Sequence, residues 1–400
     1  MLNGRFWSYL NTAKLLIENY EGDTPFHHYI KQYFRENSKY GSRDRKQISA
    51  LCYSYYRAGR ALTALPMDDR IRISWFLCSD QPGDMLAFFN EDWNMAAGSG
   101  PREKINIINA SSIDSPIRID EIFPFPDQLS KSIAADKEKF MLSHLQQPHL
   151  FLRMRPGRES TILYKLKKAG IIFEVSGSAI ILQNNTDISS ILDTDREAVV
   201  QDLGSQQTGD FIREAGAAIT ARMKGPLVWD CCAASGGKSL LAYDIIGNME
   251  LMVSDIRKSI LENLQERFNK AGVKTYKSMM ADLSKPLKGV KPLYDLIIAD
   301  LPCSGSGTWG RTPEEMHFFS AEKLAEYTAL QKQIIANTVP ALLPGGQYLY
   351  LTCSVYEAEN EAAIDFLVRH FGFRLNRMES INGYHHRADT MFAAWLTSPD

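Results

Sequence analysis

Short apolar runs alternate with amphipathic stretches through the second half of the chain. Four of these runs have the length and character of strands that are buried on both faces of a parallel sheet: Leu227 to Trp229, Leu251 to Val253, Leu296 to Ala299 and Tyr348 to Leu351. Between two of them, residues Ile256 to Ala271 carry Leu264 and Phe268 on one helical face. This alternation predicts a doubly wound, Rossmann-like α/β domain over residues 199–400, in which ligands bind at the carboxyl ends of the strands.

The first part of the chain has a helical period instead. From Ile48 to Tyr56 the apolar residues recur at steps of three and four, and Ser42 is a suitable first residue for that helix. Turn-forming residues are concentrated from Asn94 to Pro116 and predict a linker. We therefore expect residues 1–147 to form an all-helical domain that includes this linker.

The segment between these two regions has a third pattern of apolar and polar residues. Residues Phe151 to Met154, Ile171 to Val175 and Ala179 to Leu182 read as strands, and Thr161 to Ala169 reads as a short helix. Residues 148–198 are therefore expected to form a small α/β module.

The composition narrows the class of protein. Hydrophobic residues make up 44% and charged residues 23% of the chain, as in ordinary globular proteins, and no apolar run reaches the roughly 18 residues that would cross a bilayer. The N-terminus lacks the apolar core and the small-residue cleavage site of a signal peptide. We expect a cytoplasmic monomer without a membrane anchor.

The cysteines point away from a structural role. Six cysteines in 400 residues do not make a disulfide framework, and none of them forms the Cys-x-x-Cys pair of a zinc site. We expect no metal, and any functional cysteine should act as a free thiol.

Positive charge is concentrated in two stretches, although the formal net charge is -2. Residues 1–60 hold ten Lys and Arg against five acids, and residues 151–168 hold six against one, among them Arg153, Arg155 and Arg158. Such stretches can follow the phosphate backbone of RNA, and they can equally be solvated surfaces.

A loop of small residues follows the first predicted strand of the Rossmann-like domain. It consists of Cys232, Ala233, Ala234, Ser235, Gly236, Gly237 and Lys238. Small residues let the backbone approach a ligand closely, and Asp255, at the end of the next strand, is placed to accept hydrogen bonds from two ribose hydroxyls. The sequence therefore predicts a nucleoside-containing cofactor. A phosphate-binding loop of the P-loop type would need a glycine where Cys232 stands.

Asp282 follows the third predicted strand of this domain. At the end of a strand its carboxylate can accept a hydrogen bond from the amino group of adenine. A helix cap is the alternative role for a single aspartate, but the position favours binding.

Two cysteines come directly after adjacent predicted strands. Cys303 lies in an Asp-Leu-Pro-Cys turn that begins at Asp300, and Cys353 lies in a Thr-Cys-Ser turn. Carbon 5 of a pyrimidine is a poor nucleophile, so its methylation requires a thiolate to add first at carbon 6. The proton on carbon 5 must then be removed, which gives a second thiol a use, and Asp300 can hold the ring nitrogen and the amino group of the base.

Five segments of the chain together resemble one known family. The segments Cys232 to Lys238, Asp300 to Gly307 and Thr352 to Ser354 resemble the signature motifs of the NOP/Sun family of RNA (cytosine-5) methyltransferases, and Gln201 to Gln206 resembles the segment before its catalytic domain. Lys39 to Arg45 resembles the NusB-like helical domain of the RsmB branch, whose bacterial enzymes act on small-subunit ribosomal RNA. The resemblance implies a methyltransferase domain preceded by an RRM-like α/β module and a NusB-like helical domain that binds RNA.

The resemblance also implies S-adenosylmethionine as the cofactor. Its methionine part would lie along Cys232 to Lys238, its ribose at Asp255 and its adenine edge at Asp282. Ser235 stands where the family usually has proline, and Arg311 stands alone where the family tends to carry two arginines. The second departure leaves the contacts with the RNA backbone open.

For the chemistry, the resemblance implies that Asp300 lies between cofactor and target base, that Cys353 is the nucleophile and that Cys303 assists release of the product. A DNA cytosine-5 methyltransferase would instead place its nucleophile at Cys303. An RNA-binding assembly factor that had kept only the fold would show decayed motifs, whereas here both cysteines and the acids are intact. The favoured substrate is a cytosine in RNA, with ribosomal RNA as the expected partner.

Overall fold

The computed structural model describes residues 2–111, 115–221, 225–287 and 293–400, which divide into two compact units. The helical unit consists of Met1–Asp127, Ala134–Gln147 and Trp309–Ser320. The sheet unit consists of Gln128–Ile133, Pro148–Thr308 and Ala321–Asp400.

The helical unit contains no strand within its described residues. Its helices are α1 (Leu2–Glu18), α2 (Phe26–Glu36), α3 (Ser42–Arg57), α4 (Met67–Cys78), α5 (Asp84–Phe89), α6 (Glu91–Met95), α7 (Pro101–Ala110), α9 (Lys137–Ser143) and α15 (Glu315–Phe318), with a 3-10 turn η1 (Ile119–Glu121); η2 (Pro126–Gln128) and α8 (Lys131–Ala134) lie where the chain passes between units. Helix α3 begins at the predicted Ser42, because the Asp44 carboxylate accepts a hydrogen bond from the backbone N–H of Gly41 at 2.9 Å. The helical prediction is confirmed, and the likeness to NusB stays a prediction.

The predicted linker from Asn94 to Pro116 is wrong for residues 101–110, which are helical. Helix α7 occupies Pro101–Ala110, with Pro101 at its first position, where a missing N–H costs nothing. Its Ile105 and Ile108 are buried. Residues 112–114 of the predicted linker lie outside the described residues.

A segment that follows the Asp-Leu-Pro-Cys motif belongs to the helical unit. The ring of Trp309 packs 5.2 Å from that of Phe123, and Phe318 packs edge-on to Tyr20. The Glu314 carboxylate accepts a hydrogen bond from the N–H of Phe26 at 3.4 Å. The compact units thus differ from the predicted division, which places residues 199–400 in one domain.

The predicted α/β module is present at the start of the sheet unit. It is an antiparallel sheet in the order β2-β3-β1-β4, formed by β1 (Leu150–Met154), β2 (Glu174–Ser176), β3 (Ala179–Leu182) and β4 (Ala198–Val200) and packed against α10 (Glu159–Lys168). Strand β2 is shorter and later than the predicted Ile171 to Val175. Ile172 is 84% exposed, so this apolar residue does not mark a position in a buried strand.

The larger sheet has seven strands in the order β10-β11-β9-β8-β5-β6-β7. Strands β5 (Leu227–Asp230), β6 (Glu250–Asp255), β7 (Lys277–Met280), β8 (Tyr294–Asp300) and β9 (Leu342–Thr352) are parallel, and β10 (Arg374–Ile381) and β11 (Met391–Thr397) add an antiparallel edge. The helices are α11 (Leu203–Gln207), α12 (Gly209–Thr220), α13 (Gly237–Ile246), α14 (Lys258–Ala271), α16 (Ala321–Thr338) and α17 (Glu361–Phe371), with 3-10 turns η3 (Ser306–Thr308), η4 (Val339–Ala341), η5 (Glu357–Glu359) and η6 (Gly383–His386). The Rossmann-like prediction is confirmed, with a mixed rather than purely parallel sheet.

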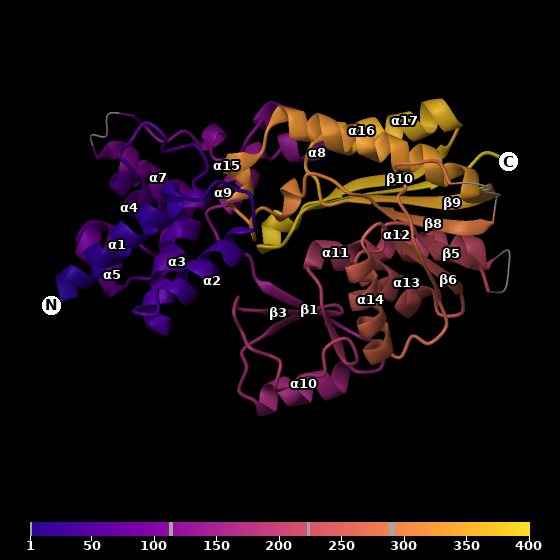
Figure 1. Ribbon diagram of the computed structural model, residues 1–400, viewed down its shortest axis with the longest axis horizontal. Helices are drawn as coiled ribbons and strands as arrows, with labels where there is room; N and C mark the ends of the chain where they lie inside the picture. The colour runs from indigo at the N-terminus through magenta and orange to yellow at the C-terminus, as the bar shows by residue number, and fades with distance from the viewer. Residues whose placement is uncertain (1, 112–114, 222–224, 288–292) are drawn as a thin grey trace. The chain divides into compact units, whose positions relative to one another are not determined.

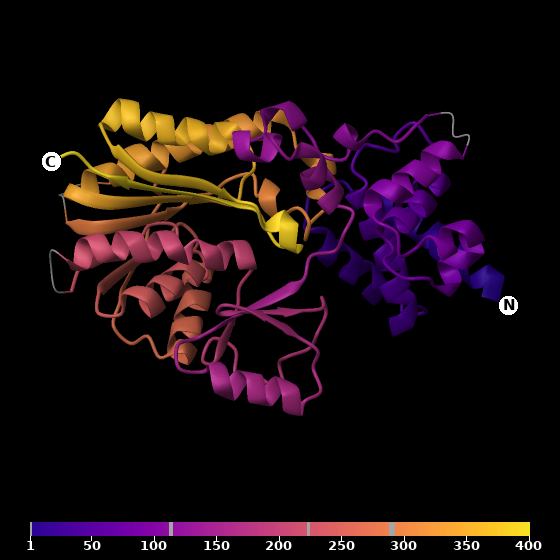
Figure 2. The ribbon, with the colours of Figure 1, turned by 180° about the vertical axis from the view of Figure 1, so that it is seen from behind.

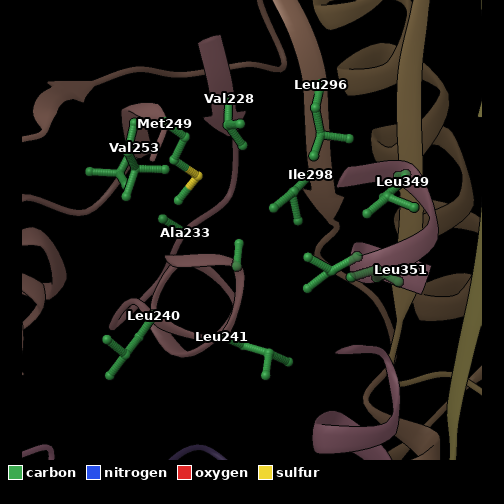
Figure 3. Packing of buried hydrophobic residues seen from close by; sticks show 14 of the residues in the cluster. Val228, Ala233, Leu240, Leu241, Met249, Val253, Leu296, Ile298, Leu349 and Leu351 are labelled. Carbon is green, nitrogen blue, oxygen red and sulfur yellow. The ribbon is translucent and has the colours of Figure 1, made fainter. Parts of the chain in front are cut away.

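Both faces of this sheet are buried. Helices α12 and α13 lie on one side and α16 and α17 on the other, as Figures 1 and 2 show from opposite directions. Along β8, Ile298 points to the first layer and Ile297 to the second, as expected from the two-residue period of a strand. Figure 3 shows residues of the first layer, to which α13 contributes Leu240 and the neighbouring strands β5 and β8 contribute Val228 and Ile298. Two-sided burial explains why these strands could be read from uninterrupted apolar runs.

Candidate active site

The predicted cofactor loop joins β5 to α13 in a tight backbone path. Ala234 and Gly236 adopt left-handed conformations, with φ of 47° and 85°. A Cβ on Gly236 would come within 2.8 Å of the Phe268 ring and 3.0 Å of Leu264, so only glycine fits there. Ser235, which stands where the family usually has proline, accepts hydrogen bonds from the Arg267 guanidinium at 3.1 Å through both its oxygens. The loop is therefore held from behind by α14.

The two acids assigned to the nucleoside end differ in burial. The Asp255 side chain is 7% exposed, and its carboxylate accepts hydrogen bonds from the N–H of Ala234 at 3.1 Å and of Arg257 at 2.9 Å. Asp282 is more open, and hydrogen bonds from Ser284 and then Lys285 lower the pKa of its carboxyl. Asp255 therefore lies against the loop, whereas the capping contacts of Asp282 fit either role considered for it.

The carboxyl ends of β5 and β8 bring three charged groups together. The Lys238 ammonium lies 3.1 Å from Asp300 and donates to the Ser205 hydroxyl at 2.8 Å. Asp230 is fully buried, and its Oδ2 accepts a hydrogen bond from Ser239 at 2.5 Å, while its Oδ1 has no partner among the described residues. Burial raises the pKa of Asp230 to about 7, with Asp300 adding to the effect. One end of the loop thus holds a carboxylate with spare hydrogen-bonding capacity.

The two predicted cysteines are in contact. The Sγ atoms of Cys303 and Cys353 lie 3.4 Å apart, and both residues are half-buried. The hydrogen bond with Cys353, together with burial, raises the pKa of the Cys303 thiol well above its usual range. Either sulfur can donate the hydrogen bond that joins the two thiols.

Gly307 ties the two cysteine turns together. Its N–H donates to the carbonyl of Cys353 at 2.8 Å, and its own carbonyl accepts from the N–H of Thr390 at 2.9 Å. A Cβ at this position would lie 2.0 Å from the Thr390 carbonyl oxygen. Glycine at this position of the motif therefore lets three chain segments meet beside the thiols.

Glu359 was not singled out by the sequence, yet it organises both turns from behind. The residue is fully buried, and its carboxylate accepts hydrogen bonds from the N–H of Ser304 at 2.7 Å and from the hydroxyls of Ser304 and Ser354 at 2.5 Å. Burial raises the pKa of this carboxyl, and the serine hydrogen bonds oppose that shift. The sequence feature that could have indicated this role is the triplet Glu359-Asn360-Glu361. It lies a few residues after β9, and it places charged residues directly before a helix.

Two of the six basic residues between positions 151 and 168 are internal, and so fit neither of the two roles considered for that stretch. Arg153 and Arg155 both bind the carboxylate of Asp244, at 2.6 and 2.7 Å, with side chains only 4% and 11% exposed. In the N-terminal stretch, Arg57 is also buried, and Lys14 pairs with Asp68 at 3.0 Å. Arginines that are desolvated and paired in this way cannot contact a phosphate backbone without breaking the pair.

Comparison with known proteins agrees with this site. The sequence profile of the family described as "16S rRNA methyltransferase RsmB/F" matches residues 218–395, which include the loop from Cys232 to Lys238 and both cysteines. Residues 218–395 therefore match the RsmB/F methyltransferase family. The predicted family and the predicted cofactor, S-adenosylmethionine, are thereby confirmed.

Curated relatives carry related names. A protein of Synechocystis named "Probable ribosomal RNA small subunit methyltransferase B" is 27% identical over 310 residues, which cover 70% of this chain and 68% of that protein. The "Ribosomal RNA small subunit methyltransferase B" of Erwinia tasmaniensis is 29% identical, covering 61% of this chain and 57% of that protein. The match therefore spans about half to two thirds of these relatives' own length.

Solved structures share the fold. The crystal structure of PH0851 superimposes with a TM-score of 0.70 at 17% identity, covering 97% of this chain and 98% of that one. The structure of NSun6 from Pyrococcus horikoshii with SFG gives 0.55 at 16% identity, covering 66% of this chain and 95% of that one. At such identities the likeness concerns the fold alone.

Two features are absent from the described residues. No helix among them is both long and apolar enough to cross a membrane. No group of three or more His, Cys, Asp or Glu side chains within that part of the chain is arranged to hold a metal ion.

Proposed function

We propose that this chain transfers a methyl group from S-adenosylmethionine to carbon 5 of a cytosine in RNA, with ribosomal RNA of the small subunit as the substrate class. The observation that carries the proposal is the 3.4 Å contact between Cys303 and Cys353, at the carboxyl ends of two adjacent strands. Most methyl transfers to nitrogen or oxygen need no thiol, whereas carbon 5 of a pyrimidine needs a covalent nucleophile.

The residues at the loop fit the cofactor. Asp255 offers a carboxylate with two acceptor oxygens to a ribose, and it already receives the N–H of Ala234 from the loop itself. The Oδ1 of Asp230, without a partner in the part of the chain that the structure describes, is an acceptor beside the loop. When bound, S-adenosylmethionine supplies an electrophilic methyl group. The residues assigned to hold it are Cys232, Ala233, Ala234, Ser235, Gly236, Gly237, Lys238, Asp255, Asp282 and Asp300.

The chain's own groups then carry the reaction. The Cys353 thiolate forms a bond to carbon 6 of the cytosine, the double bond between carbons 5 and 6 is lost, and its electron pair is available at carbon 5 for the methyl group. Cys303, as a thiolate, then accepts the proton from carbon 5, and Cys353 leaves carbon 6 as a thiolate, which restores the double bond. Asp300, held by Lys238 at 3.1 Å, orients the ring nitrogen and the amino group of the base. Cys303 assists the release step.

A methyl-transfer assay tests the proposal. RNA from cells that lack this gene is incubated with the purified chain and S-adenosylmethionine, and 5-methylcytosine is then located by bisulfite sequencing. We expect one or a few cytosines in small-subunit ribosomal RNA to gain the methyl group. Methylation of DNA in place of RNA, or of a nitrogen or oxygen atom, would overturn the proposal.

A further inference from the structure

Four cations from three different parts of the chain line one hollow in the sheet unit. Arg155 and Arg158 follow β1, Arg196 precedes β4, and Lys270 lies in the last turn of α14. The hollow has a volume of about 280 Å³, enough for a phosphate group, and its other lining residues are uncharged. We call these four side chains and the space between them the basic hollow.

The partial negative charge at the carboxyl end of α14 explains why some of these cations gather there, but not all of them. The carbonyl groups at the end of α14 attract cations, and the Arg155 guanidinium indeed donates to the carbonyl of Ala271 at 2.5 Å. Lys270 fits the same explanation. Arg158 and Arg196, however, belong to other segments and are exposed, so the helix end does not account for them.

The acids near the basic hollow are largely engaged elsewhere. Asp244 is shared by two arginines, and Glu197 accepts hydrogen bonds from Lys165 at 2.7 Å and from the N–H of Asp193 at 2.9 Å. Arg196 makes one exposed pair with Asp193 at 3.6 Å, of the kind that contributes little to stability. Because Arg155 is held by Asp244, the positive charge open to a ligand in the hollow comes from Arg158, Lys270 and the weakly paired Arg196.

We infer that the basic hollow binds a phosphodiester group of the RNA substrate, an inference that rests on the proposed function. Guanidinium groups from separate segments can each donate two parallel hydrogen bonds to phosphate oxygens, which a single surface lysine cannot. Helix α14 begins three residues after Asp255 and spans 14 residues, or about 21 Å, before it reaches the hollow. The phosphate bound there therefore belongs to a nucleotide some positions away from the target cytosine.

A paired charge-removal experiment tests the inference. The double variant Arg158→Gln/Arg196→Gln is compared with Lys167→Gln/Lys168→Gln, which removes two exposed charges from the same module outside the hollow. Binding of a fluorescent single-stranded oligocytidine RNA is measured over a range of salt. We expect the slope of log Kd against log salt to fall by about 1 in the first variant and to stay near wild type in the second. In Arg158→Gln/Arg196→Gln, the KM for RNA should rise while kcat stays at the wild-type value.

The outcomes separate this inference from the proposed function. Equal slopes in the two variants, or RNA binding by wild type that is indifferent to salt, would overturn the basic hollow as a phosphate site. Wild type that binds RNA but methylates none would overturn the proposed function, and the difference in slope would still decide the role of the hollow. Thermal unfolding of each variant confirms that the comparison is made on folded protein.

Discussion

At the scale of single residues, the decisive feature is the sulfur contact between Cys303 and Cys353. The hydrogen bond with Cys353 and burial raise the pKa of the Cys303 thiol, and either sulfur can be the donor of that bond. A donated hydrogen bond stabilises negative charge on the accepting sulfur. The contact itself is symmetric, so the assignment of Cys353 as the nucleophile stays a prediction that rests on the sequence motif.

Glu359 should act as a positioning residue for both thiols. In Glu359→Gln, an amide that also donates replaces a carboxylate that accepts from Ser304 and Ser354, so one buried group loses its partner and the turns shift. We expect kcat to fall about ten- to hundredfold, as small misplacements of reacting groups do, with unchanged affinity for S-adenosylmethionine. The control is Glu357→Gln, two residues away and exposed. Equal kcat in the two variants would exclude this role.

Asp255 should contribute directly to cofactor affinity. Asp255→Ala removes charge-assisted hydrogen bonds to the ribose, each worth about 1.5–3 kcal/mol, so the Kd for S-adenosylmethionine should rise about ten- to hundredfold per bond. Calorimetry on the folded variant measures this change. An unaltered Kd would remove Asp255 from the cofactor site.

At the scale of elements, an ion-pair cluster fastens the small sheet to the larger one. Arg153 on β1 donates to Asp244 on α13 at 2.6 Å, and burial lowers the pKa of the Arg153 guanidinium in spite of this partner. Asp244→Ala would leave two buried guanidinium groups without their anion. We expect the free energy of unfolding to fall by about 3–5 kcal/mol in denaturant titrations. Asp210→Ala, which breaks the exposed pair with Arg213, is the control and should change little.

The same elements show what could be read from the sequence. Strands β8 and β9 were predicted because both their faces are buried, which leaves an uninterrupted apolar run. The role of Arg153 could not be predicted, because a basic run looks alike whether it meets solvent, RNA or an acid 91 residues away. The Glu359 network was missed for a similar reason. Its partners are short polar side chains in two separate turns, and no periodic pattern connects them.

At the scale of the whole molecule, residues 309–320 show the limit of dividing a chain by its motifs. They continue directly from the Cys303 turn, yet their side chains complete the core of the helical unit, with Trp309 and Met316 each 1% exposed. Sequence order alone assigns this segment to the domain of its neighbours. The packing of Trp309 on Phe123 shows that the segment directly after the cysteine turn belongs to the helical unit.

The stability of the helical unit should depend on pH through His144. Burial lowers the pKa of this histidine to about 4, against about 6.5 in an unfolded chain. The folded state therefore favours the neutral ring, and the corresponding stability, about 3 kcal/mol, is present above pH 6.5 and is lost as the pH falls from 6.5 through about 4. In denaturant unfolding, His144→Gln should flatten this acid dependence relative to wild type. An acid dependence identical to wild type would show that His144 titrates normally in the fold.

The division of labour between the two cysteines is the most direct test of the whole account. Each variant, Cys353→Ala and Cys303→Ala, is incubated with substrate RNA and radiolabelled S-adenosylmethionine and then run on a denaturing gel. Loss of the nucleophile prevents the covalent intermediate, whereas loss of the release step preserves it. We therefore expect a labelled protein–RNA adduct from Cys303→Ala and none from Cys353→Ala. A stable adduct from Cys353→Ala and none from Cys303→Ala would contradict the account and place the nucleophile at Cys303.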